Sequence, residues 1–236
     1  MRFYTNVQMV GDNFLVRGYE DGKHFATREK FYPTLFVDSK RKTKYKTLDG
    51  LPVEPIEPGT VRDCREFIKK YNDVENFNVY GNERFIYQYI SDKYPETELK
   101  FDIEQIKLTT IDIEVKSEYG FPDVESCAEE ILLITLQDYT TKQIRTWGLG
   151  AFNNKQENVI YKSFKTEYEL LTDFINWWMI EDNTPEVITG WNSKLYDIPY
   201  LCRRIDRILG EKLKKRMSPW GLVTEEETFI AGRKHI

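Results

Sequence analysis

The sequence predicts an α/β protein, α+β overall, in which a β-rich region and a mixed region meet near residue 105. Residues 1–105 contain short alternating apolar and polar stretches separated by turn signals, which is typical of antiparallel strands. Residues 106–236 instead alternate strand-like stretches with stretches of helical period. The chain has 236 residues, of which 40% are hydrophobic and 14% aromatic, so it can fill more than one core.

The N-terminal region, 1–105, is predicted to begin with a small meander. Turn signals at Gly11–Asn13 and at Asp21-Gly22 separate three strand-like stretches, at 3–9, 13–19 and 24–31. The proline-rich stretch 50–59 is predicted to be a loop. A helix is expected from Thr60 to about Tyr71, because Thr60 and Asp63 occupy capping positions and apolar residues recur at helical spacing.

The C-terminal region, 106–236, is predicted to contain four strands and two helices. Thr166 and Glu169 form a capping box ahead of an apolar stripe, which predicts a helix over 166–180. A second helix is expected from Asp197 to about residue 209. The predicted strands of this region are 106–115, 130–137, 143–149 and 186–189.

The tripeptide Asp-Ile-Glu occurs twice, at 102–104 and at 112–114. In a strand, residues two apart point to the same face, so Asp-x-Glu sets two carboxylates side by side about 6.6 Å apart. The pattern by itself is weak evidence for a site, because Asp-x-Glu recurs at 73–75 and 123–125. Only the residues around each copy can separate a site from an acidic surface.

The second copy is the stronger candidate. Asp112 and Glu114 alternate with β-branched apolar residues, which indicates two acids on a face of a buried strand, where charge must be neutralised by a proton or a metal. The alternative is a pair of acids facing solvent beyond the sheet edge. Asp102 and Glu104 have polar neighbours on both sides and are interpreted as a solvated connection between the two regions.

A third acid follows a short strand that ends at Gly190 and a loop that carries Asn192. Asp197 enters a helix that has Pro199 in its first turn, and the structural explanation for such an aspartate is an N-cap. Combined with the upstream Asp112 and Glu114, the same position also allows Asp197 to supply a third carboxylate to a site.

The formal charge of −5 is unevenly distributed. After Asp197, nine basic residues stand against five acids, and five cations crowd around Tyr45: Lys40, Arg41, Lys42, Lys44 and Lys46. A charge run is most often a solvated surface, so it favours nucleic-acid binding only beside a site. The three cysteines form no Cys-x-x-Cys pair, and no apolar run is long enough to cross a bilayer. A cytoplasmic protein that does not contact a membrane is expected.

Two motifs carry a family resemblance. Asp112-Ile113-Glu114, followed later by Asn192-x-x-x-Tyr196-Asp197, resembles the first two exonuclease motifs of family B DNA polymerases, whose proofreading domain has an RNase H-like fold. The stretches "TGWNSKLYDIPYL", "RILGEKLKKRMSPWG", "FYTNVQMVGDNFLVRGYEDGK" and "TREKFYPTLF" are most similar to the T-even-like bacteriophage replicative polymerases. The resemblance covers essentially the whole chain. It implies an RNase H-like exonuclease domain over 106–236 and a β-rich N-terminal domain over 1–105.

The resemblance implies a 3′→5′ exonuclease that hydrolyses single-stranded primer ends with two Mg²⁺ or Mn²⁺ ions about 4 Å apart. Asp112 is expected to bridge both ions, Glu114 to bind the ion beside the attacking water, and Asp197 to hold the other. Asn192 is expected to position the DNA backbone, and Phe121 to pack against the terminal nucleotide, with Tyr196 also at the DNA interface.

The sequence departs from the family at the third exonuclease motif, Tyr-x-x-x-Asp, which supplies a fourth carboxylate. Two stretches fit that spacing, 45–49 and 119–123, but both precede Asp197, and after it the only aspartate is Asp206. The polymerase motifs are also absent. We therefore expect either a truncated form of a longer polymerase or one piece of a split polymerase, completed by a C-terminal portion on the same or a separate chain. The chain alone is expected to have little or no exonuclease activity.

Two other functions stay open on the sequence. One is a stand-alone exonuclease or RNase of the four-carboxylate (DEDD) type, which needs the fourth acid. The other is a noncatalytic module in which the β-rich region, with its helix at 60–71 and the basic segment around Tyr45, binds single-stranded DNA or RNA. Primer-template DNA is the partner that the family resemblance implies, and RNA is a further candidate.

Overall fold

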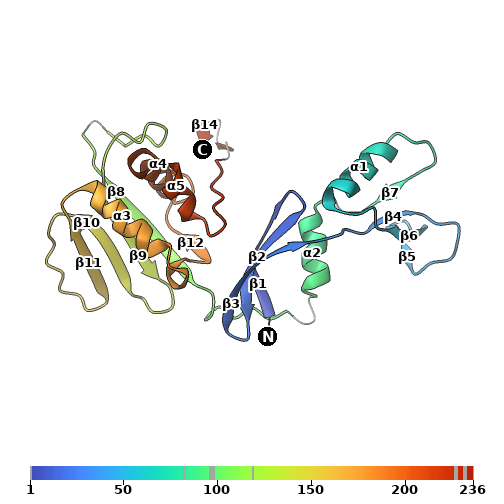
Figure 1. The fold of residues 1–236 in the computed structure, drawn as a ribbon, viewed down its shortest axis with the longest axis horizontal. Coiled ribbons are helices and arrows are strands. Elements are labelled where there is room, and N and C mark those ends of the chain that lie inside the picture. Colours follow the sequence, from blue (N-terminus) through green and yellow to red (C-terminus); the bar gives the residue numbers. More distant parts are fainter. Residues whose placement is uncertain are drawn as a thin grey trace. The chain divides into compact units, whose positions relative to one another are not determined.

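The computed structural model describes residues 2–81, 83–95, 99–118 and 120–225, and the backbone of 228–230 and 233–235. The chain forms two compact units, Met1–Gln105 and Ile106–Ile236 (Figure 1). The division falls where the pattern of the sequence changes from strands alone to strands alternating with helices. None of the helices in the described part of the chain has the length and apolar character that spanning a membrane requires.

The first unit opens with the predicted meander, which is confirmed. Strands β1 (Arg2–Val10), β2 (Asn13–Glu20) and β3 (Lys23–Lys30) pair antiparallel in that order. Helix α2 (Phe85–Lys93), which the sequence analysis did not predict, contributes Phe85 and Tyr89 to the core of this unit. Tyr89 stacks on Phe14 of β2 with ring centroids 4.8 Å apart.

The first unit also holds a small sheet in the order β5-β6-β4-β7. Its strands are β4 (Leu35–Asp38), β5 (Tyr45–Lys46), β6 (Pro52–Ile56) and β7 (Val79–Tyr80). Helix α1 (Val61–Tyr71) begins after Thr60, where the predicted capping box with Asp63 is present in full. Residues of α1 and of β4 belong to the same buried cluster, so the helix covers one face of this sheet.

The prediction that 50–59 is a loop was wrong, because β6 occupies its middle. Prolines are poorly tolerated inside sheets since they cannot donate a backbone hydrogen bond. Here Pro52 is the first residue of the strand, and Pro55 lies beyond the part of β6 that pairs with the two-residue strand β5. The missing donor of Pro55 therefore disturbs no ladder on that side.

The second unit is built on a mixed sheet in the order β11-β10-β9-β8-β12. Strands β8, β9 and β10 run antiparallel, whereas β11 is parallel to β10 and β12 is parallel to β8. The strands are β8 (Leu108–Val115), β9 (Ile131–Asp138), β10 (Ile144–Leu149), β11 (Val159–Phe164) and β12 (Val187–Thr189). The predicted strands are confirmed within two residues, and β11 is an addition to them.

Helices α3 (Glu167–Trp178) and α4 (Asp197–Leu209) confirm the two predicted helices of the second unit. Thr166 and Glu169 form the predicted capping box at the start of α3. Both helices join one buried cluster with residues of β8, β9 and β10, so they pack on the same face of the sheet (Figure 1). A bidentate ion pair between Glu167 of α3 and Arg204 of α4, at 2.7 and 2.6 Å, fastens them together.

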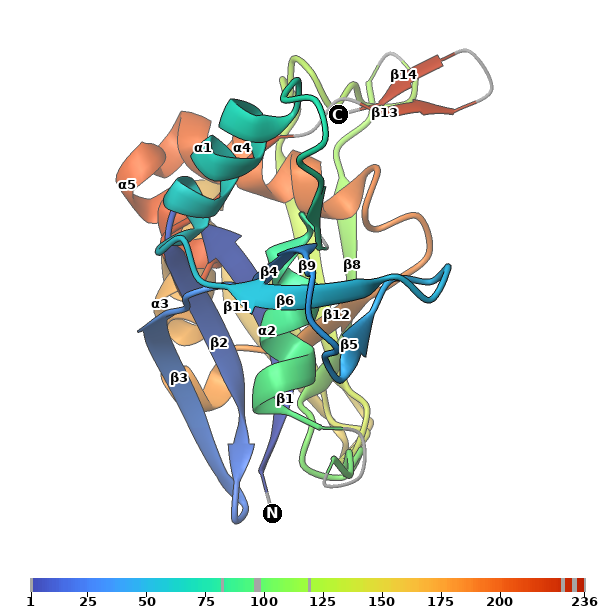
Figure 2. The same ribbon diagram turned by 90° about the vertical axis from the view of Figure 1, so that its right-hand side faces the viewer.

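The remaining elements of the second unit are short. A 3₁₀ turn η1 (Glu181–Asn183) follows α3, and α5 (Glu211–Lys214) with η2 (Lys215–Met217) follows α4. Strands β13 (Thr228–Ile230) and β14 (Arg233–His235) lie side by side as an antiparallel pair (Figure 2).

Candidate active site

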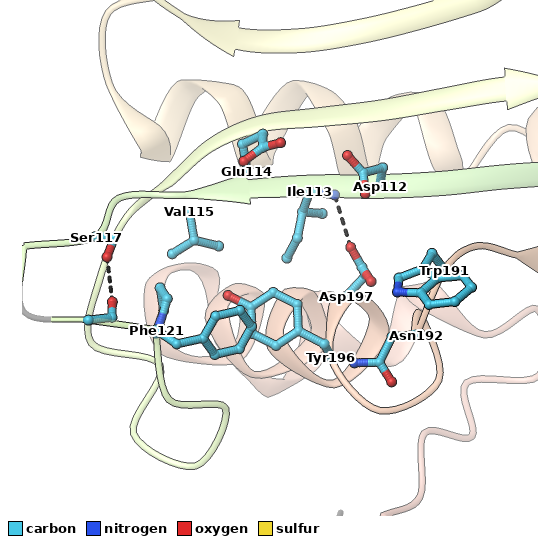
Figure 3. Close-up of a pocket in the computed structure, with 12 residues that line it drawn as sticks. Asp112, Ile113, Glu114, Val115, Ser117, Phe121, Trp191, Asn192, Tyr196 and Asp197 are labelled. Carbon is cyan, nitrogen blue, oxygen red and sulfur yellow. Dashed lines mark hydrogen bonds between the residues drawn. The ribbon is translucent and has the colours of Figure 1, made fainter.

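Strand β8 presents two different faces. Ile111 and Ile113 are buried in the core formed with α3 and α4, whereas Asp112 and Glu114 are exposed on the other face. Figure 3 shows both carboxylates projecting from the same side of the strand. The expectation that these two acids are buried was therefore wrong, because the helices cover the face that carries the isoleucines.

The alternative, a pair of acids facing solvent, describes their exposure, although β8 is not an edge strand of the sheet. Asp112 is in register with Thr135 and Glu114 with Leu133, both on β9. On its other side β8 pairs with β12 through residues 108–110. Asp112 and Glu114 therefore lie past the end of the pairing with β12, and the ladder with β9 holds their backbone in place.

Asp197 is the buried acid of this region, with an exposed fraction of 4%. It is the first residue of α4, and its carboxylate accepts a hydrogen bond of 3.0 Å from the backbone N–H of Ile113 (Figure 3). The N-cap explanation was therefore wrong: Tyr196 occupies the cap position, without a side-chain cap, and the Asp197 carboxylate contacts a strand far away in the sequence.

Burial raises the pKa of the Asp197 carboxyl above its ordinary value. Hydrogen bonds from the backbone N–H groups of Ile113 and of Asp197 itself act in the opposite direction, and the negative charge of Asp112 raises the pKa further. A buried carboxylate next to a second carboxylate is stabilised by a proton or by a cation. The electrostatics of Asp197 and Asp112 together favour the binding of positive charge.

The acids border a cavity of about 540 Å³ on the second unit. Next to the cavity, the chain that follows β12 comes close to β8, since a Cβ on Gly190 would lie 2.5 Å from the carbonyl oxygen of Ile111. All six side chains that the sequence analysis proposed for the site border this cavity, although nothing here tests their roles. The lining residues are Asp112, Ile113, Glu114, Val115, Ser117, Gly120, Phe121, Pro122, Trp191, Asn192, Tyr196 and Asp197.

Aromatic side chains form the opposite wall of the cavity. Phe121 is 82% exposed, and its ring centroid lies 4.7 Å from that of Tyr196. Burial, followed by the charge of Asp197, raises the pKa of Tyr196 to about 12, so its phenol remains a hydrogen-bond donor at neutral pH. Asn192 adopts a left-handed backbone conformation, with φ of 57°, at the loop beside this wall.

Trp191 is a lining residue that the sequence analysis missed. Its exposed fraction is 96%, so almost nothing in the second unit packs on the indole ring. The signal was present in the sequence, because a tryptophan between Gly190 and Asn192 in an otherwise polar loop has no apolar periodicity to place it in a core.

The donor set fits hard divalent cations by its chemistry. Three carboxylates border one cavity, and oxygen ligands are those that Mg²⁺ and Mn²⁺ prefer. The three carboxylates do not form a preorganised metal site. Among the described residues, no three acidic, histidine or cysteine side chains lie close enough together to hold a metal ion. The carboxylate of Asp197 is directed to the backbone of Ile113 instead.

The aspartates considered for a fourth carboxylate are all absent from the lining of this cavity. Tyr119 lies outside the described residues, and Asp123 accepts a hydrogen bond of 2.7 Å from the backbone N–H of Ser126. Asp49 belongs to the first unit, and Asp206 forms an ion pair with Lys214.

Comparisons with known proteins agree on one family. The family model for the exonuclease domain of DNA polymerase family B matches residues 60–234. The DNA-directed DNA polymerases of Escherichia phage RB69 and Enterobacteria phage T4 are each 31% identical to the chain, over 92% and 94% of it. The DNA polymerase catalytic subunit of Human herpesvirus 6A is 35% identical over 104 residues, which is 42% of this chain and 10% of that protein.

The chain spans 27% of the length of each phage relative. The mixed sheet with helices on one face and the family match together confirm the predicted α/β, RNase H-like fold class. The resemblance recognised in the two motifs is also confirmed, and the chain belongs to the exonuclease domain family of the family B DNA polymerases.

Proposed function

We propose that this chain provides the 3′→5′ proofreading exonuclease of a phage-type DNA polymerase and that its substrate is the single-stranded 3′ end of a primer. The observation that carries the proposal is the cavity of the second unit, where Asp112 and Glu114 of an interior strand meet Asp197 of a helix beside exposed aromatic rings. Family membership and the phage relatives support a role in DNA replication in an infected bacterium.

Asp112, Glu114 and Asp197 would hold two Mg²⁺ or Mn²⁺ ions. Such ions, when bound, lower the pKa of an attacking water and stabilise the leaving 3′ oxygen of the phosphodiester. Glu114 accepts a hydrogen bond from the attacking water and orients it. Asp112 contributes negative charge to both cation positions, and Asp197 remains ionised despite its burial when a cation is present.

The aromatic wall binds the unpaired end of the DNA. Phe121 and Trp191 offer exposed rings on which bases of any sequence can stack. The Tyr196 phenol donates a hydrogen bond to the DNA backbone, since its raised pKa keeps it protonated, and the Asn192 amide contacts a phosphate. Recognition by stacking suits proofreading, because any of the four bases can be the mispaired one.

Full activity needs a fourth carboxylate, which we propose comes from a polymerase portion on the same or a separate chain. The isolated chain then has little or no activity, because three acids leave the charge of two divalent cations poorly balanced. The same requirement weighs against a stand-alone exonuclease of the four-carboxylate type, since none of the candidate aspartates lines the cavity.

The test is metal binding followed by hydrolysis. Calorimetric titration of the chain with Mn²⁺ is expected to show binding that Asp112→Ala/Glu114→Ala weakens at least tenfold. The matched control is Asp102→Ala/Glu104→Ala, which removes the same two residue types from the other Asp-Ile-Glu tripeptide and leaves Mn²⁺ affinity unchanged. Wild-type protein that binds no Mn²⁺, or equal losses in both variants, would contradict the proposed site.

Hydrolysis is measured on a single-stranded oligonucleotide in Mg²⁺ and in Mn²⁺. We expect at most slow release of mononucleotides from the 3′ end, eliminated by Asp112→Ala. Rapid degradation that Asp112→Ala abolishes would show that three carboxylates suffice, and degradation that persists in Asp112→Ala would show that another site is responsible.

A further inference from the structure

The loop between β8 and β9, residues 116–130, carries Phe121 to the wall of the cavity. The described part of this loop forms no helix or strand, so a regular backbone ladder does not fix its shape. Loops of this length are uncommon in compact domains, and they fluctuate unless specific contacts hold them. Phe121 cannot anchor the loop, because its side chain is 82% exposed. The position of its ring therefore depends on what holds the backbone of the loop.

A tight turn follows Phe121 within this loop. The backbone N–H of Ser126 donates a hydrogen bond of 2.7 Å to the Asp123 carboxylate, and the N–H of Cys127 donates one of 3.0 Å to the Asp123 carbonyl oxygen. Cys127 has a left-handed backbone conformation, with φ of 42°, which is costly for a residue with a Cβ atom. Such a conformation persists only where the surrounding structure holds it, so the turn needs support from outside the loop.

Arginines of α4 supply this support. The guanidinium of Arg203 donates a hydrogen bond of 2.9 Å to the carbonyl oxygen of Val124. Arg207 donates hydrogen bonds of 3.0 and 3.3 Å to the carbonyl oxygens of Ser126 and Cys127. Residues four apart in a helix lie on the same side of it, so both arginines face the loop. They satisfy carbonyl oxygens that the turn itself leaves without a partner.

Arg204 also contacts the loop, but its role differs. Its guanidinium donates to the carbonyl oxygens of Cys127 and Ala128, at 2.9 and 3.0 Å, and forms the buried ion pair with Glu167. Removing Arg204 would leave a buried carboxylate without its cation, which destabilises the whole unit. The two other arginines can be replaced without this consequence, since Arg203 is partly buried and Arg207 is exposed.

Glu225 fixes the direction of the Arg203 guanidinium. Its carboxylate accepts hydrogen bonds from Nε and Nη2 of Arg203, at 3.3 and 2.9 Å. A guanidinium is planar, so two bonds to one carboxylate set its plane and direct Nη1 to Val124. Arg203 thereby joins the segment that follows η2 to the loop that precedes β9.

Helix α4 consequently holds both rings of the aromatic wall. Tyr196 is the N-cap residue of α4, and Figure 3 shows its ring beside that of Phe121, at 4.7 Å between centroids. Neither arginine borders the cavity, so any effect of these residues on a ligand passes through the loop. We propose that Arg203 and Arg207 are positioning residues that hold Phe121 beside Tyr196 before DNA binds.

This inference rests on the proposed function, because the ligand that meets Phe121 is the unpaired end of a primer. A ring that is already in place does not have to be ordered when a base stacks on it. Loss of the arginines is therefore expected to weaken DNA binding although neither side chain touches the DNA.

Hydrogen exchange of the chain without DNA or metal tests the support of the loop. In Arg203→Ala/Arg207→Ala, the amides of Ser126 and Cys127 are expected to exchange roughly tenfold faster or more, with α3 and β8 unchanged. Unchanged exchange in the loop overturns the proposal. Faster exchange throughout the second unit also overturns it, because the arginines would then support the fold as a whole. The milder variant Arg203→Ala is expected to show a smaller increase in the loop alone.

Fluorescence anisotropy tests the role in binding, with a labelled single strand of deoxythymidine about 12 nucleotides long in EDTA, which prevents hydrolysis. Phe121→Ala is expected to weaken binding on the order of tenfold, and Arg203→Ala/Arg207→Ala by roughly three- to tenfold. Combining all three substitutions is expected to cost no more than Phe121→Ala alone, because an absent ring cannot be positioned. Losses that multiply would show that the arginines act independently of Phe121, which overturns the proposal.

Two further variants separate positioning from charge. The matched control Lys212→Ala/Lys215→Ala removes two exposed cations of the same unit, and its loss of affinity is expected to disappear as salt is raised. The loss in Arg203→Ala/Arg207→Ala is expected to persist, and equal salt dependence in the two variants overturns the proposal.

Glu225→Gln removes a negative charge, so charge alone predicts tighter binding of DNA. Positioning predicts weaker binding, by about two- to threefold, because the guanidinium of Arg203 loses its bidentate partner. Tighter binding by Glu225→Gln overturns the proposal.

The variants also distinguish failure of this inference from failure of the proposed function. If Phe121→Ala binds like the wild type, the proposed stacking is wrong and the positioning role is wrong with it. If Phe121→Ala weakens binding and Arg203→Ala/Arg207→Ala does not, the positioning role alone is wrong.

Discussion

The two Asp-Ile-Glu tripeptides have the same composition but different structures. At 102–104 the chain turns, and the carboxylate of Asp102 accepts hydrogen bonds from the backbone N–H of Glu104 and the side-chain amide of Gln105, at 3.1 and 2.7 Å. At 112–114 the chain is an interior strand, and the backbone of Ile113 is the donor to a distant carboxylate, Asp197. The first copy forms hydrogen bonds with its immediate neighbours, whereas the second copy forms one with a residue of another element.

The isoleucines show the same contrast. Ile113 is 6% exposed within the core of the second unit, and Ile103 is 52% exposed. A buried central residue fixes the strand, and the strand fixes where its flanking acids point. A pair of acids in a strand is therefore a stronger candidate for a site when the residue between them is buried in a core, because the buried residue fixes the direction of both acids.

The largest expected effect concerns these two isoleucines. Ile113→Ala is expected to lower the free energy of unfolding by about 2–4 kcal/mol, since it leaves a cavity in a packed core. Ile103→Ala is expected to change it by less than about 0.5 kcal/mol. All five tryptophans lie in the second unit, so tryptophan fluorescence during urea denaturation measures the unit that contains Ile113. Far-UV circular dichroism measures Ile103→Ala, and equal losses would contradict the comparison.

The next prediction concerns Asp197, whose carboxylate accepts a hydrogen bond from the backbone N–H of Ile113 in the second tripeptide. Because its pKa is raised in the folded protein, the folded state retains a proton that the unfolded state has lost, and stability falls as the pH rises from about 4. Asp197→Asn is expected to remove this fall, since the amide oxygen can still accept the hydrogen bond from Ile113. The measurement is urea denaturation of both proteins across the acid range to neutral pH, without metal. Parallel stability curves would contradict the raised pKa.

Stabilisation by Mg²⁺ at neutral pH is a second way to compare the wild type with Asp197→Asn. Mg²⁺ at about one hundred times its dissociation constant is expected to stabilise the wild type by about 2.7 kcal/mol. Asp197→Asn is expected to gain less, because it lacks one charged ligand. Equal gains in the two proteins would indicate that Mg²⁺ binds elsewhere.

The smallest effect is expected at the first tripeptide. Asp102→Ala removes the acceptor of two hydrogen bonds and is expected to cost about 1 kcal/mol. Glu104→Ala, at an exposed position of the same turn, is expected to cost less than about 0.5 kcal/mol. Thermal unfolding followed by far-UV circular dichroism measures both. A larger effect at Glu104 than at Asp102 would mean that the turn depends on the exposed acid.

Local features of the fold were predictable because local residues produce them. The capping boxes at Thr60 and Thr166 are satisfied within four residues, and alternation of apolar side chains identifies β8 before any partner is known. The motifs built on Asp112 and on Asn192 to Asp197 were also sufficient to recognise the family, which the comparisons confirm.

Distant contacts were less predictable. The prolines of β6 led to the prediction of a loop, because the strands that pair with β6 are distant in the sequence. Trp191 was missed because its exposure depends on the packing of other elements around it. Alternation also cannot tell which face of β8 the helices cover. The cost of burial was therefore assigned to Asp112 and Glu114, whereas the buried acid that lines the cavity is Asp197.

The meander of the first unit, four strands of the second, the capped helices and the family could be predicted from residue spacing and capping, because these signals act over a few residues. Only the tertiary structure decided that Asp197 turns to Ile113 instead of capping its own helix, and that Arg203 and Arg207 contact the loop that carries Phe121. Burial, charge neutralisation and surface chemistry depend on which elements meet, and those elements are far apart in the chain.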